Sequence, residues 1–255
     1  MDLTSIAELT GVSIAAGWVD AVVGGGGLIL IPALLLAFPQ LPPAVALGTN
    51  KLTAITGTSA AALTFVRRTK VPRSVALPAA LLAVPAAGLG ALSASSVPGD
   101  WFRPIVMALL IGVAAFVASK PGFGAVQGAE VVTRRRRLFV ICLAGCGVGF
   151  YDGVFGPGTG TFLILAFTGL LSLEFLQSAA MAKVVNVGTN LGALCVFAAQ
   201  GNVLWSLGAT MAVGNVVGAA LGARTALRRG SGFVRIVLLV AVSGMVLKLA
   251  VDQFG

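Results

Sequence analysis

Four ionisable side chains lie inside stretches of this sequence that are otherwise apolar. Two are carboxylates, Asp20 and Asp152, and two are amines, Lys51 and Lys183. In such an environment a carboxylate can carry a proton or pair with a lysine, and a lysine supplies positive potential for an anion. Because charged groups are costly there, we expect these four to face a cavity or one another. The alternative for the lysines is an interfacial anchor, since each lies close to the start of its apolar run.

Each aspartate stands four residues before a glycine-rich segment. The segments are Gly24 to Gly27 and Gly156-Pro157-Gly158-Thr159-Gly160. Glycine costs backbone entropy in a helix and proline lacks an N–H, so a helix should break at both segments. A half-helix that begins at Gly27 or Gly160 directs its free N–H groups at the break, and this suits an anion. Close helix packing is the alternative use of these glycines.

Hydroxyl and amide side chains cluster around the two lysines. In the first cluster Thr49 and Thr53 share a helical face, and in the second Asn186 and Asn190 do. Such groups can hydrogen-bond an oxyanion, although bonding between helices is their ordinary role in membranes. The predicted substrate-binding residues are Gly25, Gly26, Gly27, Thr49, Asn50, Lys51, Gly158, Thr159, Gly160, Lys183, Asn186 and Asn190. The predicted proton-coupling residues are Asp20 and Asp152.

The residues suited to chemistry recur at a constant spacing. Adding 132 to the residue numbers of Asp20, Lys51 and Gly24 gives Asp152, Lys183 and Gly156 in the second half. This shift, the repeat offset, also matches Leu89-Gly90-Ala91 with Leu221-Gly222-Ala223. An internal duplication is the simplest explanation. An offset of 140 also matches positions 48–50 with 188–190, so the register of the second helix of each half stays open.

The composition indicates a membrane protein. Of the 255 residues, 58% are hydrophobic and 10% are charged, with no histidine; charged residues make up about a quarter of an ordinary soluble domain. The net charge of +9 does not indicate nucleic-acid binding, because the charges stand between the apolar runs. There are eight such runs, each long enough to cross roughly 30 Å of hydrocarbon as a helix. They are Ser5 to Phe38, Ala44 to Val66, Val75 to Leu92, Trp101 to Ser119, Leu138 to Leu171, Phe175 to Ala199, Val203 to Ala223 and Gly232 to Val251.

Lysine and arginine gather in three gaps between the runs, and this predicts the orientation of the chain. The clusters at 67–73, 120–137 and 224–229 hold twelve of the seventeen cations. Short basic loops stay in the cytoplasm, so the cation-free loops 93–100 and 200–202 should lie outside. The loop at 67–73 is then inside while its counterpart at 200–202 is outside. The two halves are therefore expected to be inverted.

Inverted halves need an odd number of membrane crossings each. We therefore expect each glycine-broken run to be a re-entrant hairpin, which leaves three crossings per half. The alternative is eight straight spans with parallel repeats. The expected fold is an all-α polytopic membrane protein with two four-segment repeats. Residues 1–119 form the first transmembrane repeat, 120–137 a basic cytoplasmic linker, and 138–255 the second repeat.

Taken together, these motifs resemble those of the sulfite exporter TauE/SafE family of membrane transporters. The residues that carry the resemblance are the glycine runs after the two aspartates, the segment Gly48-Thr49-Asn50-Lys51-Leu52, and Lys183 with Asn186. They cover nearly the whole chain in order. The resemblance implies a multi-pass protein of the inner or plasma membrane. Studied members of the family move sulfite, sulfonates and related sulfur-containing organic anions, and many members have no assigned substrate.

We therefore expect a secondary transporter, an exporter or a permease, for a small anion such as sulfite or a sulfonate, working by alternating access around the breaks. The sequence has no nucleotide-binding loop, histidine or metal-ligand cluster, so neither an enzyme nor a cofactor is expected. The expected partners are the lipid bilayer, the anion, and a proton or another coupling ion. An anion channel and a membrane-embedded assembly protein without transport activity are the alternatives. The substrate, the direction of transport and the oligomeric state stay open.

Overall fold

The structure is a computed structural model that describes residues 3–94 and 132–254. Every regular element within these ranges is a helix. Four of the helices are long and apolar enough to cross a membrane. The predicted class, an all-α polytopic membrane protein, is confirmed at this level. The expected run Trp101 to Ser119 and most of the expected linker, including Lys120, lie outside the described residues.

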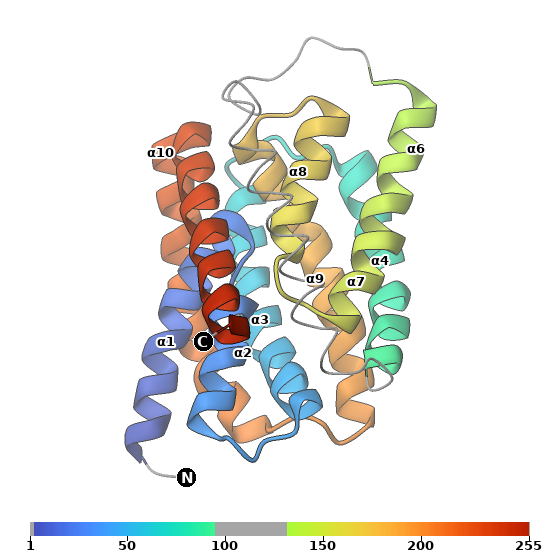
Figure 1. Ribbon diagram of the computed structural model, residues 1–255. Helices are drawn as coiled ribbons and strands as arrows, with labels where there is room; N and C mark the ends of the chain where they lie inside the picture. The colour runs from blue at the N-terminus through green and yellow to red at the C-terminus, as the bar shows by residue number, and fades with distance from the viewer. Residues whose placement is uncertain (1–2, 95–131, 255) are drawn as a thin grey trace.

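The first long apolar run folds as two helices joined at the predicted glycine break. Helix α1 (Leu3–Val23) ends just before Gly24, and α2 (Gly27–Ala37) begins at the last glycine of the run. Gly24 has a φ of 80°, in the left-handed region that glycine adopts without a steric penalty. In Figure 1, α1 runs inward from the end of the molecule that carries the N-terminus, and α2 returns toward that end.

The fifth apolar run has a similar course from the opposite end of the molecule. Helix α6 (Arg134–Cys142) continues through the π-helical segment η1 (Leu143–Val148) into α7 (Gly149–Val154), and α8 (Thr159–Leu171) follows the break. Two glycines of this break have left-handed φ angles of 84° and 81°. The expected helix start at Gly160 is one residue late. Figure 1 shows α6 starting at the end opposite to the N-terminus and α8 returning there.

Four further helices complete the described part of the chain. They are α3 (Pro43–Val66), α4 (Arg73–Ala94), α9 (Phe175–Ala199) and α10 (Trp205–Phe254). Helix α10 joins the last two expected runs and changes direction at Gly230, whose φ is 76°. The first residues of α2, α3 and α4 are related by the repeat offset to those of α8, α9 and α10, respectively.

Helices from the first and second halves of the chain pack against each other. Helix α1 lies along α10, α4 lies along η1 and α7, and α3 contacts α9. Glycine allows backbone contact at two of these crossings. A Cβ atom on Gly222 would lie 2.5 Å from the carbonyl oxygen of Trp18, and one on Gly90 would overlap the carbonyl oxygen of Phe150. The repeat offset relates both the two glycines and their two partners, so equivalent positions make equivalent contacts.

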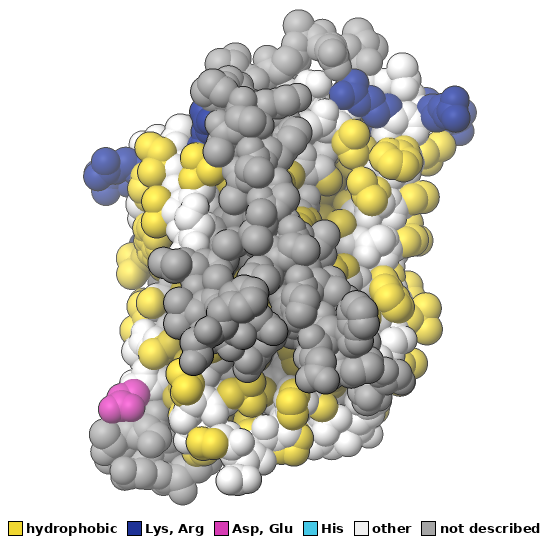
Figure 2. Space-filling model, in the orientation of Figure 1, with side chains coloured by type: hydrophobic (Ala, Val, Ile, Leu, Met, Phe, Trp, Pro, Cys, Tyr) yellow, Lys and Arg dark blue, Asp and Glu magenta, His cyan; other side chains and the backbone are white. Residues whose placement is uncertain are grey.

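The outer surface is apolar along its sides and basic at one end. Exposed large apolar side chains include Leu36, Leu81 and Val240, which are 77%, 72% and 68% exposed. On the face in Figure 2, the Lys and Arg side chains lie toward the end from which α6 starts, and an acidic side chain lies near the N-terminal end. Broad exposed apolar surface of this kind suits contact with lipid.

Candidate functional site

Two ion pairs connect the halves of the chain crosswise. Lys183 Nζ donates to Asp20 Oδ2 at 2.9 Å, and Lys51 Nζ donates to Asp152 Oδ2 at 2.6 Å. Each pair joins the carboxylate of one half to the amine of the other. The side chains of Lys51 and Lys183 are only 2% and 0% exposed, so their alternative interpretation as interfacial anchors is wrong. Burial of these charges is possible because each amine has a carboxylate partner.

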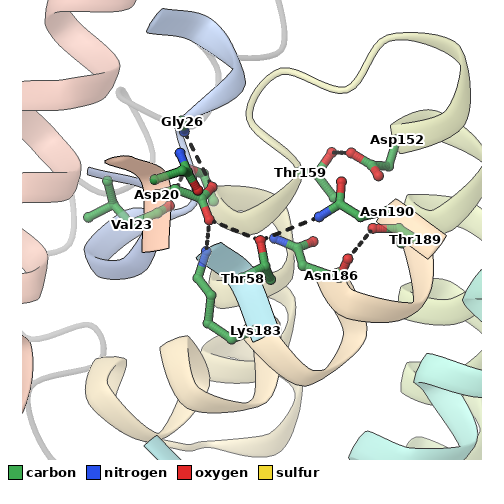
Figure 3. Close-up of polar contacts among 12 residues, drawn as sticks. Asp20, Val23, Gly26, Thr58, Asp152, Thr159, Lys183, Asn186, Thr189 and Asn190 are labelled. Atoms are coloured by element: carbon green, nitrogen blue, oxygen red, sulfur yellow. Dashed lines mark hydrogen bonds and ion pairs between the residues drawn. The ribbon is translucent and has the colours of Figure 1, made fainter. Parts of the chain in front are cut away.

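The second oxygen of each aspartate binds the break that follows it. The backbone N–H of Gly26 donates to Asp20 Oδ1 at 3.3 Å, and the Thr159 hydroxyl donates to Asp152 Oδ1 at 2.6 Å. These contacts lie at the starts of α2 and α8, where N–H groups lack helical partners and the helix dipole favours negative charge. Figure 3 shows Asp20 between Gly26 and Lys183. Each aspartate therefore holds a break in place and neutralises a lysine at the same time.

The two glycine breaks face each other. Gly24 lies so close to Gly160 that a Cβ atom on either residue would overlap the Cα atom of the other. The Thr161 hydroxyl donates to the carbonyl oxygen of Val23 at 2.9 Å, which links the second break to the end of α1. Backbone groups without helical partners are tolerated at membrane depth only where protein or a cavity surrounds them. The packing of one break on the other provides that surrounding.

A cavity of about 30 Å³ lies where the breaks meet the ion pairs. A water molecule needs at least about 10–15 Å³ measured in this way, so the cavity has room for one or two waters. Its wall contains residues that the repeat offset relates, such as Asp20 with Asp152 and Gly27 with Thr159. The wall is formed by Asp20, Gly24, Gly27, Asn50, Lys51, Ala54, Asp152, Gly156, Thr159, Asn186 and Asn190.

Two asparagines in the cavity wall have an unsatisfied amide oxygen. Within the described part of the chain, the Oδ1 atoms of Asn50 and Asn186 are buried without a hydrogen-bond partner, and the residues are 4% and 5% exposed. Leaving such a group unpaired costs about 1–3 kcal/mol. An amide can present its carbonyl or its NH₂ group after a half-turn, so these side chains can either accept from or donate to a bound molecule. The cavity thus has free hydrogen-bonding capacity in both halves.

A third amide connects equivalent positions of the two halves. Asn190 Nδ2 donates to the Thr58 hydroxyl at 3.4 Å, and the repeat offset relates these two residues. The Thr58 hydroxyl in turn donates to Asp20 Oδ2 at 3.4 Å. Figure 3 shows this connected chain of polar groups between α1, α3 and α9.

The structure brings most of the predicted site residues together. Lys183 and Gly26 contact Asp20 behind the wall, and Gly160 supports the first break. The predicted residues that line the cavity are Asp20, Gly27, Asn50, Lys51, Asp152, Thr159, Asn186 and Asn190.

Three further predicted residues also do not line the cavity. Gly25 is buried within the first break, and Gly158 forms the left-handed turn that precedes α8. Thr49 lies elsewhere, because its hydroxyl oxygen accepts a hydrogen bond at 3.0 Å from the backbone N–H of Leu204, just before α10. The shared face of Thr49 and Thr53 is therefore turned toward α10.

Three residues of the wall were not predicted from the sequence. Gly24 and Gly156 belong to the repeated breaks, so the repeat offset was a signal that pointed to both. Ala54 has no functional group, and its only signal was that the repeat offset relates it to Asn186.

Comparison with known proteins shows the family of this chain. The family model described as "Sulfite exporter TauE/SafE" matches residues 9–249. The "Probable membrane transporter protein ORF9" of Sinorhizobium sp is 40% identical over 93% of this chain and 89% of its own length. The "Probable membrane transporter protein YfcA" of Escherichia coli K12 is 36% identical over 96% of this chain and 89% of its own length. A "Probable membrane transporter protein" of Haemophilus influenzae is 35% identical over 97% of this chain and 95% of its own length.

No solved structure matches the chain significantly. The family model and the relatives nevertheless cover almost all of the sequence, and they describe membrane transporters and not enzymes. The chain therefore belongs to the sulfite exporter TauE/SafE family of membrane transporters.

Proposed function

We propose that this chain is a secondary transporter for a small anion and that the cavity between the breaks is its substrate site. The main support is the two crossed ion pairs beside two amide oxygens that have no hydrogen-bond partner among the described residues, at the point where two broken helices meet. Transporters commonly bind anionic groups at the N-terminal ends of broken helices. Sulfite and sulfonates are the first anions to test, because the family is described by sulfite export.

The proposal includes an inverted repeat. It is supported by the helix starts that recur at the repeat offset and by the two hairpins, which enter from opposite ends in Figure 1. The contact between Thr58 and Asn190 adds support, since residues at equivalent positions touch only near a two-fold axis. In this proposal, alternating access consists of one half rocking against the other around that axis.

Opening of the cavity is part of the proposed cycle. A volume of about 30 Å³ holds one or two waters, which is too little for an anion of four or more heavy atoms. The two breaks lie in the wall with three members of the crossed ion pairs, and Lys183 contacts Asp20 from behind it; these groups must separate. We therefore interpret the described conformation as an occluded state, and substrate entry as the opening of one ion pair.

The charges of the site support coupling of anion transport to a proton. Two lysines and two aspartates sum to zero, so a monoanion adds one uncompensated negative charge. A proton on Asp20 or Asp152 removes that charge and also releases a lysine to the anion. An unpaired buried charge costs several kcal/mol, so anion and proton bind together. The proposed cycle moves one proton with each monoanion and transfers no net charge.

Flux into proteoliposomes tests the coupling. We expect a pH gradient to drive anion accumulation in the wild type, and a membrane potential alone to drive none. Asp20→Asn and Asp152→Asn should abolish proton-driven accumulation, because an amide cannot carry the proton. Each variant leaves a buried lysine unpaired, so accumulation is compared per folded protein, as measured by size-exclusion chromatography. Unchanged accumulation in both variants would refute the coupling role.

Thermal unfolding of the purified protein tests the anion site, because a ligand that binds the folded state raises Tm. Sulfite, sulfate, thiosulfate, taurine, sulfoacetate and simple carboxylates are suitable probes. We expect at least one to raise the wild-type Tm and to have no effect on Asn186→Leu. The unliganded Tm of that variant should not fall, since the amide that it loses has an unsatisfied oxygen. An equal response in both proteins, or none to any anion, contradicts the site.

Kinetics distinguish the transporter from an anion channel, which the same duplicated breaks would also serve. Saturable flux that is stimulated by anion on the opposite side supports a transporter. Flux that rises without saturation supports a channel. A folded protein with no flux for any probe anion supports the other alternative, a membrane-embedded assembly protein.

A further inference from the structure

A second hollow lies at the surface, between the end of α3 and the middle of α10. Its volume is about 550 Å³. Arg67 and Arg68 from the end of α3 and Arg224 and Arg228 from α10 line it, together with Leu227. Four guanidinium groups from segments far apart in the sequence therefore surround one space.

The guanidinium groups of these four arginines have no hydrogen-bond or ion-pair partner among the residues that the structure describes. All four are exposed, and the two ion pairs found in the described ranges are the crossed pairs of the cavity. Cations are favoured at helix ends and in cytoplasmic loops, which accounts for basic residues at this end of the molecule. That preference does not account for their convergence, because unpaired like charges around one hollow repel each other. A concave surface lined by one sign of charge focuses potential and attracts a counter-ion.

The arginines of the hollow have no basic counterparts at the repeat offset. The repeat offset relates Arg67 and Arg68 to Ala199 and Gln200, and it relates Arg224 to Leu92 in the first half. The aspartates, the lysines and the glycine breaks of the cavity do recur at this offset. The arginine hollow thus belongs to one end of the molecule and is separate from the repeated substrate machinery.

Exposed leucines lead away from the hollow along both helices. Leu63 stands four residues before Arg67, and Leu221 stands three before Arg224, so each lies on the same helical face as an arginine. The two leucines are 52% and 49% exposed. A phosphate group fits the forked geometry of arginine, and basic hollows between transmembrane helices suit anionic head groups. An exposed apolar surface beside the hollow suits the acyl chains of the same molecule.

We propose that the arginine hollow binds the phosphate head group of an anionic phospholipid, with the acyl chains along the exposed leucines. The site holds the lipid at the basic end of the protein, where α3 ends and the first part of α10 ends. A lipid bound there bridges a helix of the first half to a helix of the second half.

Lipid binding to the purified full chain in detergent tests this proposal. The probes are phosphatidylglycerol and cardiolipin, with phosphatidylcholine as the zwitterionic comparison, and bound lipid is counted by native mass spectrometry. We expect Arg224→Gln/Arg228→Gln to weaken binding of the anionic lipids about thirtyfold, because each arginine near an anionic head group contributes roughly fivefold. Arg224→Lys/Arg228→Lys should retain part of the affinity, since charge remains and the fork is lost.

The matched control is Arg134→Gln/Arg135→Gln, which removes two exposed arginines at the start of α6 that do not line the hollow. It should bind anionic lipid like the wild type. Equal loss in both double variants overturns the proposal in favour of unspecific surface attraction. Circular dichroism and size-exclusion chromatography verify that each variant is folded.

Soluble probes distinguish a lipid from a free phosphate. Short-chain phosphatidylglycerol should raise the wild-type Tm and not that of Arg224→Gln/Arg228→Gln. Inorganic phosphate and glycerol 3-phosphate at the same concentration should have little effect, because they lack acyl chains. If inorganic phosphate raises Tm as strongly as the lipid, and the arginine variant abolishes the effect, the hollow is a soluble-phosphate site and the lipid proposal is wrong.

Discussion

The buried positions of Lys51 and Lys183 depend on carboxylates from the opposite half of the chain. Each amine is at most 2% exposed and has an aspartate oxygen within 2.9 Å. Replacing a whole buried pair by apolar groups is often neutral, whereas removing one partner leaves an uncompensated charge. Separating the two halves would therefore leave two buried lysines and their aspartates without partners, which is costly.

Stability measurements on the Lys183–Asp20 pair follow from this argument. We expect Lys183→Met to lower the free energy of unfolding by an amount toward the lower end of about 3–5 kcal/mol, since Asp20, whose side chain is 17% exposed, is left without its cation. Lys183→Met/Asp20→Asn should recover much of that loss, because no charge is left unpaired. Lys70→Met is the control, as Lys70 is exposed and its change should stay within about 0.5 kcal/mol. Additive losses in the double variant contradict the pairing.

The sequence predicted that the two aspartates and two lysines are functional groups, but it did not predict which of them pair. The aspartates and lysines were predictable because ionisable groups in apolar runs are rare and costly. Which lysine meets which aspartate was not predictable, since all four lie in separate helices and the choice depends on how the halves cross. Thr49 was misplaced for a related reason: three-residue and four-residue spacing defines a helical face without defining which neighbour it meets.

The glycine breaks are the elements that bring these side chains together. Gly24 combines a φ of 80° with backbone contact to Gly160, so two independent constraints exclude a side chain there. The first is the steric penalty of a left-handed conformation, and the second is overlap with the other break. Neither constraint can be relieved without moving one break away from the other.

Alanine substitutions at Gly24 and at Gly11, which lies in α1, distinguish these two constraints from ordinary helix propensity. We expect Gly24→Ala to destabilise the protein by more than about 1–3 kcal/mol, since backbone overlap adds to the conformational penalty. Gly11→Ala is the control, because Gly11 is exposed in α1 with no atom near its would-be Cβ, and alanine should stabilise by up to about 1 kcal/mol. Thermal unfolding of both variants is the measurement. Equal destabilisation at the two positions would contradict the role of the break.

Element boundaries were predictable where glycine and proline define them. The run of four glycines indicated the end of α1 and the start of α2, and Pro43 begins α3. The π-helical segment Leu143–Val148 also contains glycines, Gly145 and Gly147, but glycine does not distinguish a π-helical turn from an α-helical one. The last two apolar runs were expected as separate helices, and the chain does bend between them, at Gly230. The first helix continues beyond its apolar run up to that glycine.

At the scale of the whole molecule, the loop at 200–202 and the basic connection from α3 to α4 lie at opposite ends of the protein, as the predicted orientation requires. The loop at 200–202 and the start of α3 lie together, since a Cβ atom on Gly48 would overlap the carbonyl oxygen of Asn202. The connection from α3 to α4, which contains Lys70, contacts the start of α9 through Gln177. Because α9 spans the distance between these two regions, they belong to opposite ends.

Cysteine accessibility in intact cells measures this orientation. The exposed natural cysteines Cys142, Cys146 and Cys195 are first replaced by serine. We then expect Gln200→Cys to react with an impermeant maleimide from outside, and Lys70→Cys to react only after the cells are opened. Labelling of Gln200→Cys from the cytoplasm would remove the inverted topology and favour eight straight spans.

The overall class was the most predictable property, because composition alone excludes a soluble domain and the duplicated motifs resemble one family. The family is confirmed along almost the whole chain. The inverted arrangement remains part of the proposal, since loop charges indicate sides of a membrane only through a statistical preference. Substrate choice was beyond the sequence because it depends on the shape of a cavity that both halves build.

Under the proposed inverted repeat, the crossed ion pairs have an evolutionary consequence. A half-length ancestor with one aspartate and one lysine at these positions leaves both groups unpaired when it stands alone in the membrane. Two copies in antiparallel orientation complete each other, because the aspartate of each meets the lysine of its neighbour, as Asp20 meets Lys183 and Asp152 meets Lys51. Gene fusion then makes the pairing permanent. Afterwards a substitution at either aspartate selects for compensation in the other repeat, so homologous sequences should show covariation between 20 and 183 and between 51 and 152.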